Sequence, residues 1–136
     1  MTPQELVRLA EEAMSRAYAP YSRYQVGAAL LCADGSVYQG CNIENAAYSP
    51  TNCAERTAFF KAVYDGHREF AAIAVAGGMH GKASSLCSPC GVCRQEMQEF
   101  CGRDFLIHIG KGNGEYETVT LQQLLPYGFS EDNLEV

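Results

Sequence analysis

The chain has 136 residues, the length of one domain with a single hydrophobic core, so we expect one domain over residues 1–136. Its formal net charge is −6 and its 10 lysines and arginines are scattered, which argues against a nucleic acid polymer as a partner and favours a small neutral substrate. Residues 1–20 lack the basic start and apolar stretch of a secretion signal, and no segment is expected to span a membrane, so the expected location is cytoplasmic.

The N-terminal elements are a helix and a hairpin. Thr2 can cap the helix, because Glu5 lies three residues after the cap, and apolar residues then recur on one face up to about residue 17. The next elements are two antiparallel strands joined by an AspGly turn, at residues 26–32, 34–35 and 37–43.

Helices and strands alternate in the rest of the chain. The predicted elements are a helix, a strand, a helix beginning at Ser88 and Pro89, two strands and a short helix, at residues 53–64, 71–76, 88–100, 105–109, 116–119 and 121–125. Residues 77–86, with three glycines, are expected to form a loop. This order predicts an α/β fold with three layers (α/β/α), in which a mixed five-stranded sheet has helices on both faces.

The 7 cysteines are many for this length. Their odd count, the missing secretion signal and a CysxxCys spacing favour reduced thiols and a metal ion over disulfides. Cys32 and Cys41 fall in predicted strands and are expected to be small core residues, and Cys101 lies at a helix end. The histidines have no ligand spacing and are expected to bind nothing, at positions 67, 80 and 108.

Three cysteines have the spacing of a catalytic zinc site. Cys53 opens one predicted helix, and Cys90 and Cys93 lie one helical turn apart at the start of another. Thiolates form most readily at helix N-termini, where free NH groups and the helix dipole favour negative charge. Three protein ligands leave the fourth tetrahedral position for water, which is typical of catalytic zinc. We therefore expect one Zn²⁺ per chain on these three thiolates.

Glu55 and Arg56 follow the first of these ligands. Glu55, two residues after Cys53, can reach the water without binding the metal, which makes it the candidate catalytic proton shuttle. Together with ProCysxxCys at 89–93, this matches the signature of zinc deaminases. Three thiolates and one dication leave a negative charge that a guanidinium can offset. Arg56 is preferred for this role, whereas Arg94 is equally well explained as a solvent-facing helix residue.

Cys87 leaves an alternative open. With Cys90 and Cys93 it forms CysxxCysxxCys, which also suits a closed four-thiolate zinc or an iron–sulfur cluster. However, Pro89 separates Cys87 from the helix that orients the other two, and a bacterial-type cluster would need a fourth cysteine at position 97, where this chain has methionine. We do not expect Cys87 to be a ligand.

Beyond the metal motif, the chain resembles the small homotetrameric zinc-dependent cytidine deaminases over nearly its whole length. The matching segments are TyrAlaProTyrSer at 18–22, ValGlyAlaAlaLeu at 26–30, GlyCysAsnIleGluAsnAlaAlaTyr at 40–48, CysAlaGluArgThrAla at 53–58, ProCysGlyValCysArgGln at 89–95 and LeuLeuProTyrGlyPhe at 124–129. The resemblance implies a cytidine deaminase-like fold, a nucleoside substrate and a homotetramer with sites shared between subunits.

Asn42 and Glu44 lie two residues apart at a strand end, where an amide and a carboxylate can hydrogen-bond ribose hydroxyls. The resemblance implies further substrate-binding residues, which are Tyr24 beside the base, Ala54 through its backbone NH, Phe129 reaching into a neighbouring subunit's pocket, and Asn45, Ala46, Ala47 and Tyr48 in the pocket wall. Tyr24 stands where phenylalanine is usual, and its hydroxyl needs a polar partner if it is buried.

These features predict deamination of cytidine and 2′-deoxycytidine to uridine and 2′-deoxyuridine with release of ammonia, in pyrimidine salvage. A blasticidin-type deaminase shares the metal motifs, but AsnIleGluAsn at 42–45 favours the nucleoside. A non-catalytic zinc module with four cysteines, Cys87 included, would leave Glu55 without a role. Deamination of a polynucleotide would need a basic and aromatic groove, and the sequence shows none.

Overall fold

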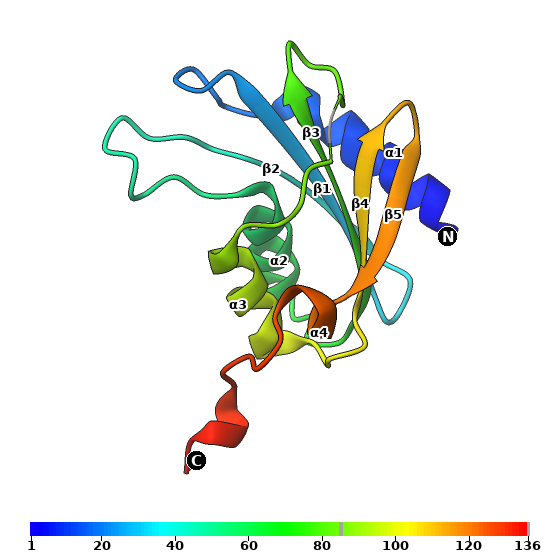
Figure 1. Ribbon diagram of the computed structural model, residues 1–136, viewed down its shortest axis with the longest axis vertical. Coiled ribbons are helices and arrows are strands. Elements are labelled where there is room, and N and C mark those ends of the chain that lie inside the picture. The colour runs from blue at the N-terminus through cyan, green and yellow to red at the C-terminus, as the bar shows by residue number, and fades with distance from the viewer. Residues whose placement is uncertain (85, 136) are drawn as a thin grey trace.

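A computed structural model describes residues 1–84 and 86–135 (Figure 1). Its strands are β1 Tyr24–Cys32, β2 Val37–Cys41, β3 Phe70–Met79, β4 Leu106–Gly112 and β5 Glu115–Thr120. They form a single sheet in the order β2-β1-β3-β4-β5. β3 and β4 are parallel and the other neighbouring pairs are antiparallel, which confirms the predicted mixed five-stranded sheet.

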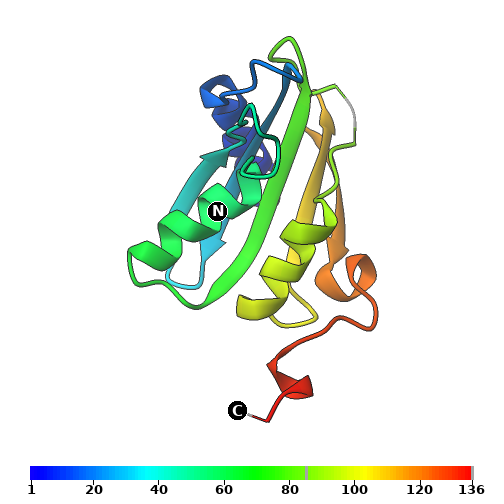
Figure 2. The same ribbon diagram turned by 90° about the vertical axis from the view of Figure 1, so that its left-hand side faces the viewer.

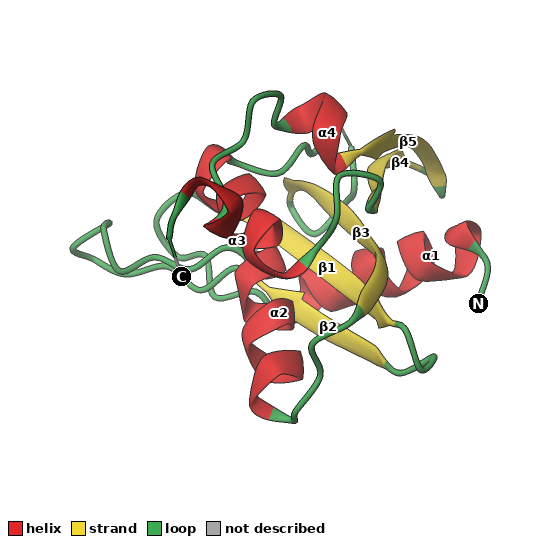
Figure 3. Ribbon diagram, turned by 90° about the horizontal axis from the view of Figure 1, so that it is seen from below, coloured by secondary structure: helices red, strands yellow, loops and turns green. Residues whose placement is uncertain are grey.

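Helices cover both faces of the sheet. They are α1 Pro3–Ala13, α2 Ala54–Tyr64, α3 Gly91–Phe100 and α4 Leu121–Leu124, with short 3₁₀ turns at Met14–Arg16 and Glu131–Asn133. Figures 2 and 3 show α1 on one side of the sheet and α2 and α3 on the other. The predicted three-layer α/β/α arrangement is confirmed.

Successive side chains of β1 point to opposite faces of the sheet, so the hydrophobic core has two parts. Ala28 and Leu30 belong to the cluster that includes α2 and α3, whereas Ala29 belongs to the cluster formed with α1. Neighbouring side chains of a strand point to opposite faces of a sheet, so one strand serves both layers. All three side chains are fully buried, so β1 lies at the centre of the hydrophobic core.

Gly40 sets how closely α2 approaches the sheet. A Cβ at this position would lie 2.4 Å from the Ala54 carbonyl oxygen and 2.6 Å from the Ala58 nitrogen. Only a residue without a side chain lets the first turns of α2 lie against β2. This contact fixes the N-terminus of α2, where Cys53 and Glu55 lie.

The predicted first helix and hairpin are confirmed, but several boundaries differ. Thr2 and Glu5 form the expected capping box. The strand predicted at 37–43 ends at Cys41, and Ile43 makes only isolated bridges with Tyr18 and Asn52. The loop predicted at 77–86 begins later, because β3 continues through Gly77 and Gly78 to Met79; position 85 lies outside the described residues.

The predicted start of α3 at Ser88 and Pro89 is wrong. Cys90 is the N-cap and Gly91 is the first helical residue. The Arg94 side chain accounts for the difference, since its Nε donates to the Pro89 carbonyl (2.8 Å) and its Nη2 donates to the Ser88 hydroxyl (2.8 Å). These bonds hold both residues outside the helix.

In the part of the chain that the structure describes, no helix combines the length and the apolar character needed to cross a membrane.

Candidate metal centre and substrate pocket

The Sγ atoms of Cys53, Cys90 and Cys93 converge where the N-termini of α2 and α3 meet. Sγ of Cys90 lies 3.6 Å from that of Cys53 and 3.5 Å from that of Cys93, and all three lie within 4.8 Å of one another. Tetrahedral zinc with bonds of about 2.3 Å to sulfur places its sulfur ligands about 3.8 Å apart. The three thiols therefore fit zinc without rearrangement of the backbone.

Helix N-termini and hydrogen bonds favour the thiolate form in this cluster. Cys53 and Cys90 are the N-caps of α2 and α3, so both sulfurs lie at the positive ends of helix dipoles. The hydrogen bond from Cys93, followed by those from Arg56 and Cys90, lowers the pKa of Cys53 to about 5. The same contact with the Cys53 thiolate raises the pKa of Cys93. The first negative charge of the cluster is therefore stabilised on Cys53.

The two arginines near the cluster have different roles. Nη2 of Arg56 contacts Sγ of Cys53 at 3.4 Å and the Thr51 carbonyl oxygen at 3.4 Å, so its charge lies beside the sulfur. Arg94 instead bonds to the loop before α3 and donates from Nη1 to the Leu124 carbonyl (2.8 Å). The expected solvent-facing role does not describe Arg94, which joins α3 to α4.

Glu55 lies in the first turn of α2 and is only 4% exposed. Burial is the largest cause that raises its pKa, to about 7, and the neighbouring Cys53 thiolate acts in the same direction. A carboxyl with a pKa near neutrality can both take and give a proton at physiological pH. This is the property that a catalytic proton shuttle requires.

A cavity of about 310 Å³ opens beside the cysteine cluster. It is lined by six of the predicted site residues, Tyr24, Asn42, Cys53, Ala54, Glu55 and Cys90. The structure thus brings together side chains from β1, the end of β2, α2 and the start of α3. Its size is in the range of pockets that enclose small organic ligands.

Asn42 is held rigidly at this pocket. Its Oδ1 accepts a hydrogen bond from the Val26 NH (2.9 Å), and its Nδ2 donates to the Tyr24 carbonyl (2.9 Å). The side chain is 9% exposed, so the orientation of the amide is set by β1. An amide fixed in this way retains one acceptor lone pair and one NH for a further partner.

Glu44 lies outside the lining of the pocket. Its carboxylate accepts hydrogen bonds from the backbone NH of Tyr21 (2.9 Å), the backbone NH of Ser22 (3.1 Å) and the Ser22 hydroxyl. These bonds, led by those from Ser22, lower the pKa of Glu44. Glu44 therefore anchors the 18–22 segment beside the strand end and stays ionised.

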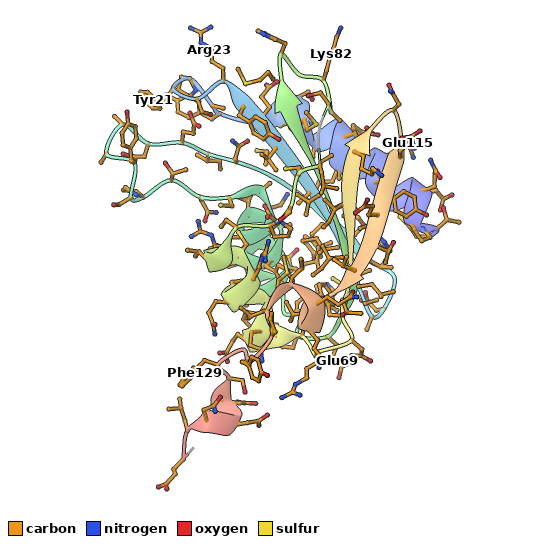
Figure 4. The ribbon with its side chains drawn as sticks, viewed as in Figure 1. Tyr21, Arg23, Glu69, Lys82, Glu115 and Phe129 are labelled. Atoms are coloured by element: carbon orange, nitrogen blue, oxygen red, sulfur yellow. The ribbon has the colours of Figure 1, made fainter. Side chains whose placement is uncertain are left out.

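The remaining predicted substrate-binding residues are exposed within this chain. Asn45, Ala46, Ala47 and Tyr48 belong to the connection between β2 and α2, which projects from the body of the molecule in Figure 1. Phe129 is 55% exposed, and Figure 4 shows it on the C-terminal segment, far from Tyr21. These residues do not contribute to the pocket within the single chain.

Cys87 lines the pocket and is not one of the predicted metal ligands. In the described part of the chain it is not a member of the group formed by the other three thiols, and burial raises its pKa to about 11. It packs against Tyr24 over Gly77, where a Cβ would lie 2.6 Å from the Cys87 sulfur and 2.9 Å from the Tyr24 ring. Cys87 is thus part of the pocket wall, as a neutral thiol.

Glu96 was not singled out from the sequence, because a glutamate in a helix is usually exposed. Both of its carboxylate oxygens, like Nε of Arg56, are buried and have no hydrogen-bond partner among residues 1–84 and 86–135. Burial raises the pKa of Glu96 to about 8, while the charge of Arg56 opposes the shift. This is an acidic group next to the arginine that contacts the metal cluster.

Comparisons with known proteins identify the family of this chain. The family described as "Cytidine and deoxycytidylate deaminase zinc-binding region" matches residues 1–109. The chain belongs to this family. Cytidine deaminases of Sporosarcina psychrophila and Halalkalibacterium halodurans are 49% and 47% identical to it over 134 residues, which is 98% of this chain and 96% and 98% of theirs.

Solved structures of the family share the fold. The crystal structure of cytidine deaminase from Burkholderia pseudomallei superposes with a TM-score of 0.87 at 45% identity, covering 95% of this chain and 100% of that one. The predicted cytidine deaminase-like fold is confirmed, and the cysteine cluster lies in the region that the zinc-binding family matches.

Proposed function

We propose that this chain catalyses the hydrolytic deamination of cytidine and 2′-deoxycytidine, with zinc as cofactor, yielding uridine or 2′-deoxyuridine and ammonia. The observation that carries the proposal is the convergence of three thiols and a buried glutamate on one cavity, in a chain of this family. Cys53, Cys90 and Cys93 would hold the ion. When bound, zinc polarises a water molecule and lowers its pKa toward about 7, which provides a nucleophile at neutral pH.

Glu55 is the proton carrier in this proposal. It accepts a proton from the attacking water and delivers it to N3 of the base as the water oxygen bonds to C4. It then carries the second proton to the amino group, the C4–N bond breaks and ammonia leaves, while the C4 carbonyl forms. The pKa of about 7 supports this role, because both protonation states of Glu55 are populated at neutral pH.

Arg56 tunes the charge of the site. Three thiolates and a zinc ion sum to one negative charge, which weakens the metal as a Lewis acid. A guanidinium 3.4 Å from the Cys53 sulfur withdraws part of that charge. The acidity of the water is restored by this contact.

Substrate binding uses the rigid end of β2 and the start of α2. Asn42 and Glu44 bind the ribose hydroxyls, Tyr24 packs by the base, and the Ala54 NH, which has no acceptor within its own helix, binds the base carbonyl. To bind the ribose, the Glu44 carboxylate must accept hydrogen bonds from the ribose hydroxyls while it also accepts one from the Ser22 NH. The hydroxyl of Tyr24 lies beside Cys87 and narrows the part of the pocket that holds the base.

Residues that are exposed in the single chain complete the site when subunits associate. We infer a homotetramer in which Asn45, Ala46, Ala47, Tyr48 and Phe129 meet at subunit boundaries. Their exposure, including 71% for Tyr48 and 55% for Phe129, supports a role outside the isolated chain. We further infer that residues 1–136 are one domain and that the enzyme acts in cytoplasmic pyrimidine salvage.

The other readings receive less support. A closed four-cysteine zinc module would need the Cys87 sulfur close to the other three, and Cys87 lies in the pocket wall instead. A blasticidin-type substrate lacks the free ribose that Asn42 and Glu44 are suited to bind. A nucleic acid polymer is disfavoured by the net charge of −6.

The test is a deamination assay with cytidine, 2′-deoxycytidine and blasticidin S in competition, combined with zinc analysis. We expect rapid loss of the cytidine absorbance and one zinc per chain at the cluster of Cys53, Cys90 and Cys93. Glu55→Gln should retain zinc and lose about 10²- to 10⁴-fold in kcat, while the exposed Glu69→Gln serves as the matched control. Full activity of Glu55→Gln would remove the shuttle assignment, and preference for blasticidin would overturn the substrate assignment.

A further inference from the structure

A second group of potential metal ligands lies outside the pocket. Cys32 ends β1, Asp34 lies in the turn to β2, and His67 follows α2. One donor atom from each lies within 4.8 Å of the others, and among the described residues the only other such group is the cysteine cluster of the pocket. The sequence did not predict this group, because His67 is far from Cys32 and Asp34 along the chain.

Two turns hold these residues in place. The Cys32 NH donates to the Ser36 carbonyl (2.8 Å), which closes the hairpin. The Ala33 NH donates to the Glu69 carbonyl (2.9 Å), which ties the hairpin to the segment that carries His67. The group is therefore assembled by backbone hydrogen bonds that do not depend on the ligand side chains themselves.

Neighbouring contacts also orient the side chains. Oδ1 of Asp34 accepts a hydrogen bond from the Ser36 NH (2.9 Å), and Oδ2 lies 3.7 Å from Nδ1 of His67. The Tyr38 ring packs edge-on against the His67 ring at 5.3 Å, and its hydroxyl donates to Asp65 Oδ2 (2.6 Å). Outer contacts of this kind fix the direction of histidine and carboxylate ligands in protein metal sites.

We propose that Cys32, Asp34 and His67 bind one divalent ion of zinc-like chemistry, in addition to the zinc of the pocket. Thiolate, carboxylate and imidazole are ligands that zinc and its neighbours accept together, and the two anionic ligands neutralise a dication. Nitrogen and oxygen ligands at about 2.0–2.2 Å from a tetrahedral ion lie about 3.3–3.6 Å apart, and the Asp34–His67 pair, at 3.7 Å, is close to that spacing.

The three side chains differ in exposure, which sets the side from which an ion can reach them. Cys32 is 1% exposed, whereas the side chains of His67 and Asp34 are 22% and 58% exposed. The ion enters from the solvent side, where water completes its coordination, and the thiolate stays shielded. Bound there, it would tie the β1–β2 hairpin to the segment between α2 and β3.

The experiment is a titration of Co²⁺ into enzyme adjusted to one zinc per chain. Zinc binds more tightly than cobalt, so cobalt leaves the pocket zinc in place. We expect one bound cobalt per chain with a thiolate-to-cobalt charge-transfer band. Cys32→Ser should lose the band and His67→Gln should weaken binding by at least about tenfold. Cys41→Ser, on the neighbouring strand, is the matched control and should retain both signals.

Two results would overturn the proposal. One is no cobalt binding by the zinc-loaded enzyme, which would leave Asp34 and His67 as a side-chain contact only. The other is a charge-transfer band that persists in Cys32→Ser. If that variant does not fold, Asp34→Asn and His67→Gln, which alter partly exposed side chains, decide by the same measurement. Deamination is not expected to change in any of them, so this proposal and the proposed function fail separately.

Discussion

Replacing Glu96 with glutamine should reduce the dependence of stability on pH. The folded state raises the pKa of Glu96 from 4.5 to about 8, mainly by burial, with Arg56 opposing and Glu55 adding to the shift. The folded protein therefore keeps a proton that the unfolded chain loses as the pH rises above 4.5. Stability falls from that point and levels off above about pH 8. Glu96→Gln has no such titration.

Conversion at about 1.4 kcal/mol per pKa unit gives only an upper bound for this effect. Glu96 is partly buried and lies near the charge of Arg56, so we expect about 1–3 kcal/mol, the usual cost of a buried polar group without a partner. Urea unfolding of zinc-loaded protein at pH 5 and pH 9 measures it. Between pH 5 and pH 9, the free energy of unfolding of the wild type should fall by about 1–3 kcal/mol more than that of Glu96→Gln. Equal pH dependence in both proteins, or the same change in the exposed Glu99→Gln, would refute the reasoning.

Two further substitutions test the position of α2 and the role of the arginine. Gly40→Ala places a Cβ 2.4 Å from the Ala54 carbonyl oxygen and should cost about 1–3 kcal/mol in urea unfolding, whereas Gly91→Ala meets nothing within 4 Å and should not. Arg56→Gln removes the contact with Cys53 and should lower zinc affinity and kcat by about 10- to 100-fold. Unchanged zinc affinity in a chelator competition would contradict the charge-tuning role.

Local signals in the sequence were sufficient for most of the fold. The ThrxxGlu start of α1 and the AspGly turn of the first hairpin form as predicted, because both depend on residues close together in the chain. The three cysteines of the metal motif come together for a related reason. Each cysteine lies at a helix start that the sequence marks, and the sheet order brings the two helix starts together.

Tertiary contacts account for the differences. The start of α3 depends on Arg94, whose bonds to Ser88 and Pro89 outweigh the local SerPro signal. β3 passes through two glycines, and Gly77 fits there because Cys87 and Tyr24 occupy the space of a side chain. No periodicity reveals such packing.

The sequence did not predict the burial of the Glu96 carboxyl or the group formed by Cys32, Asp34 and His67, and the reason is the same in both cases. The burial of Glu96 depends on the helix face that α3 presents to Arg56. His67 lies near Cys32 where the Ala33–Glu69 hydrogen bond joins two turns. Segments far apart in the sequence determine both.

X-ray absorption at the zinc edge, on enzyme loaded with one zinc per chain, tests the open three-thiolate site most directly. The three converging cysteine sulfurs predict three sulfur neighbours at about 2.3 Å and one oxygen or nitrogen neighbour at about 2.0–2.2 Å. Four sulfur neighbours would contradict the account, because a closed site leaves no position for the water that displaces the amino group.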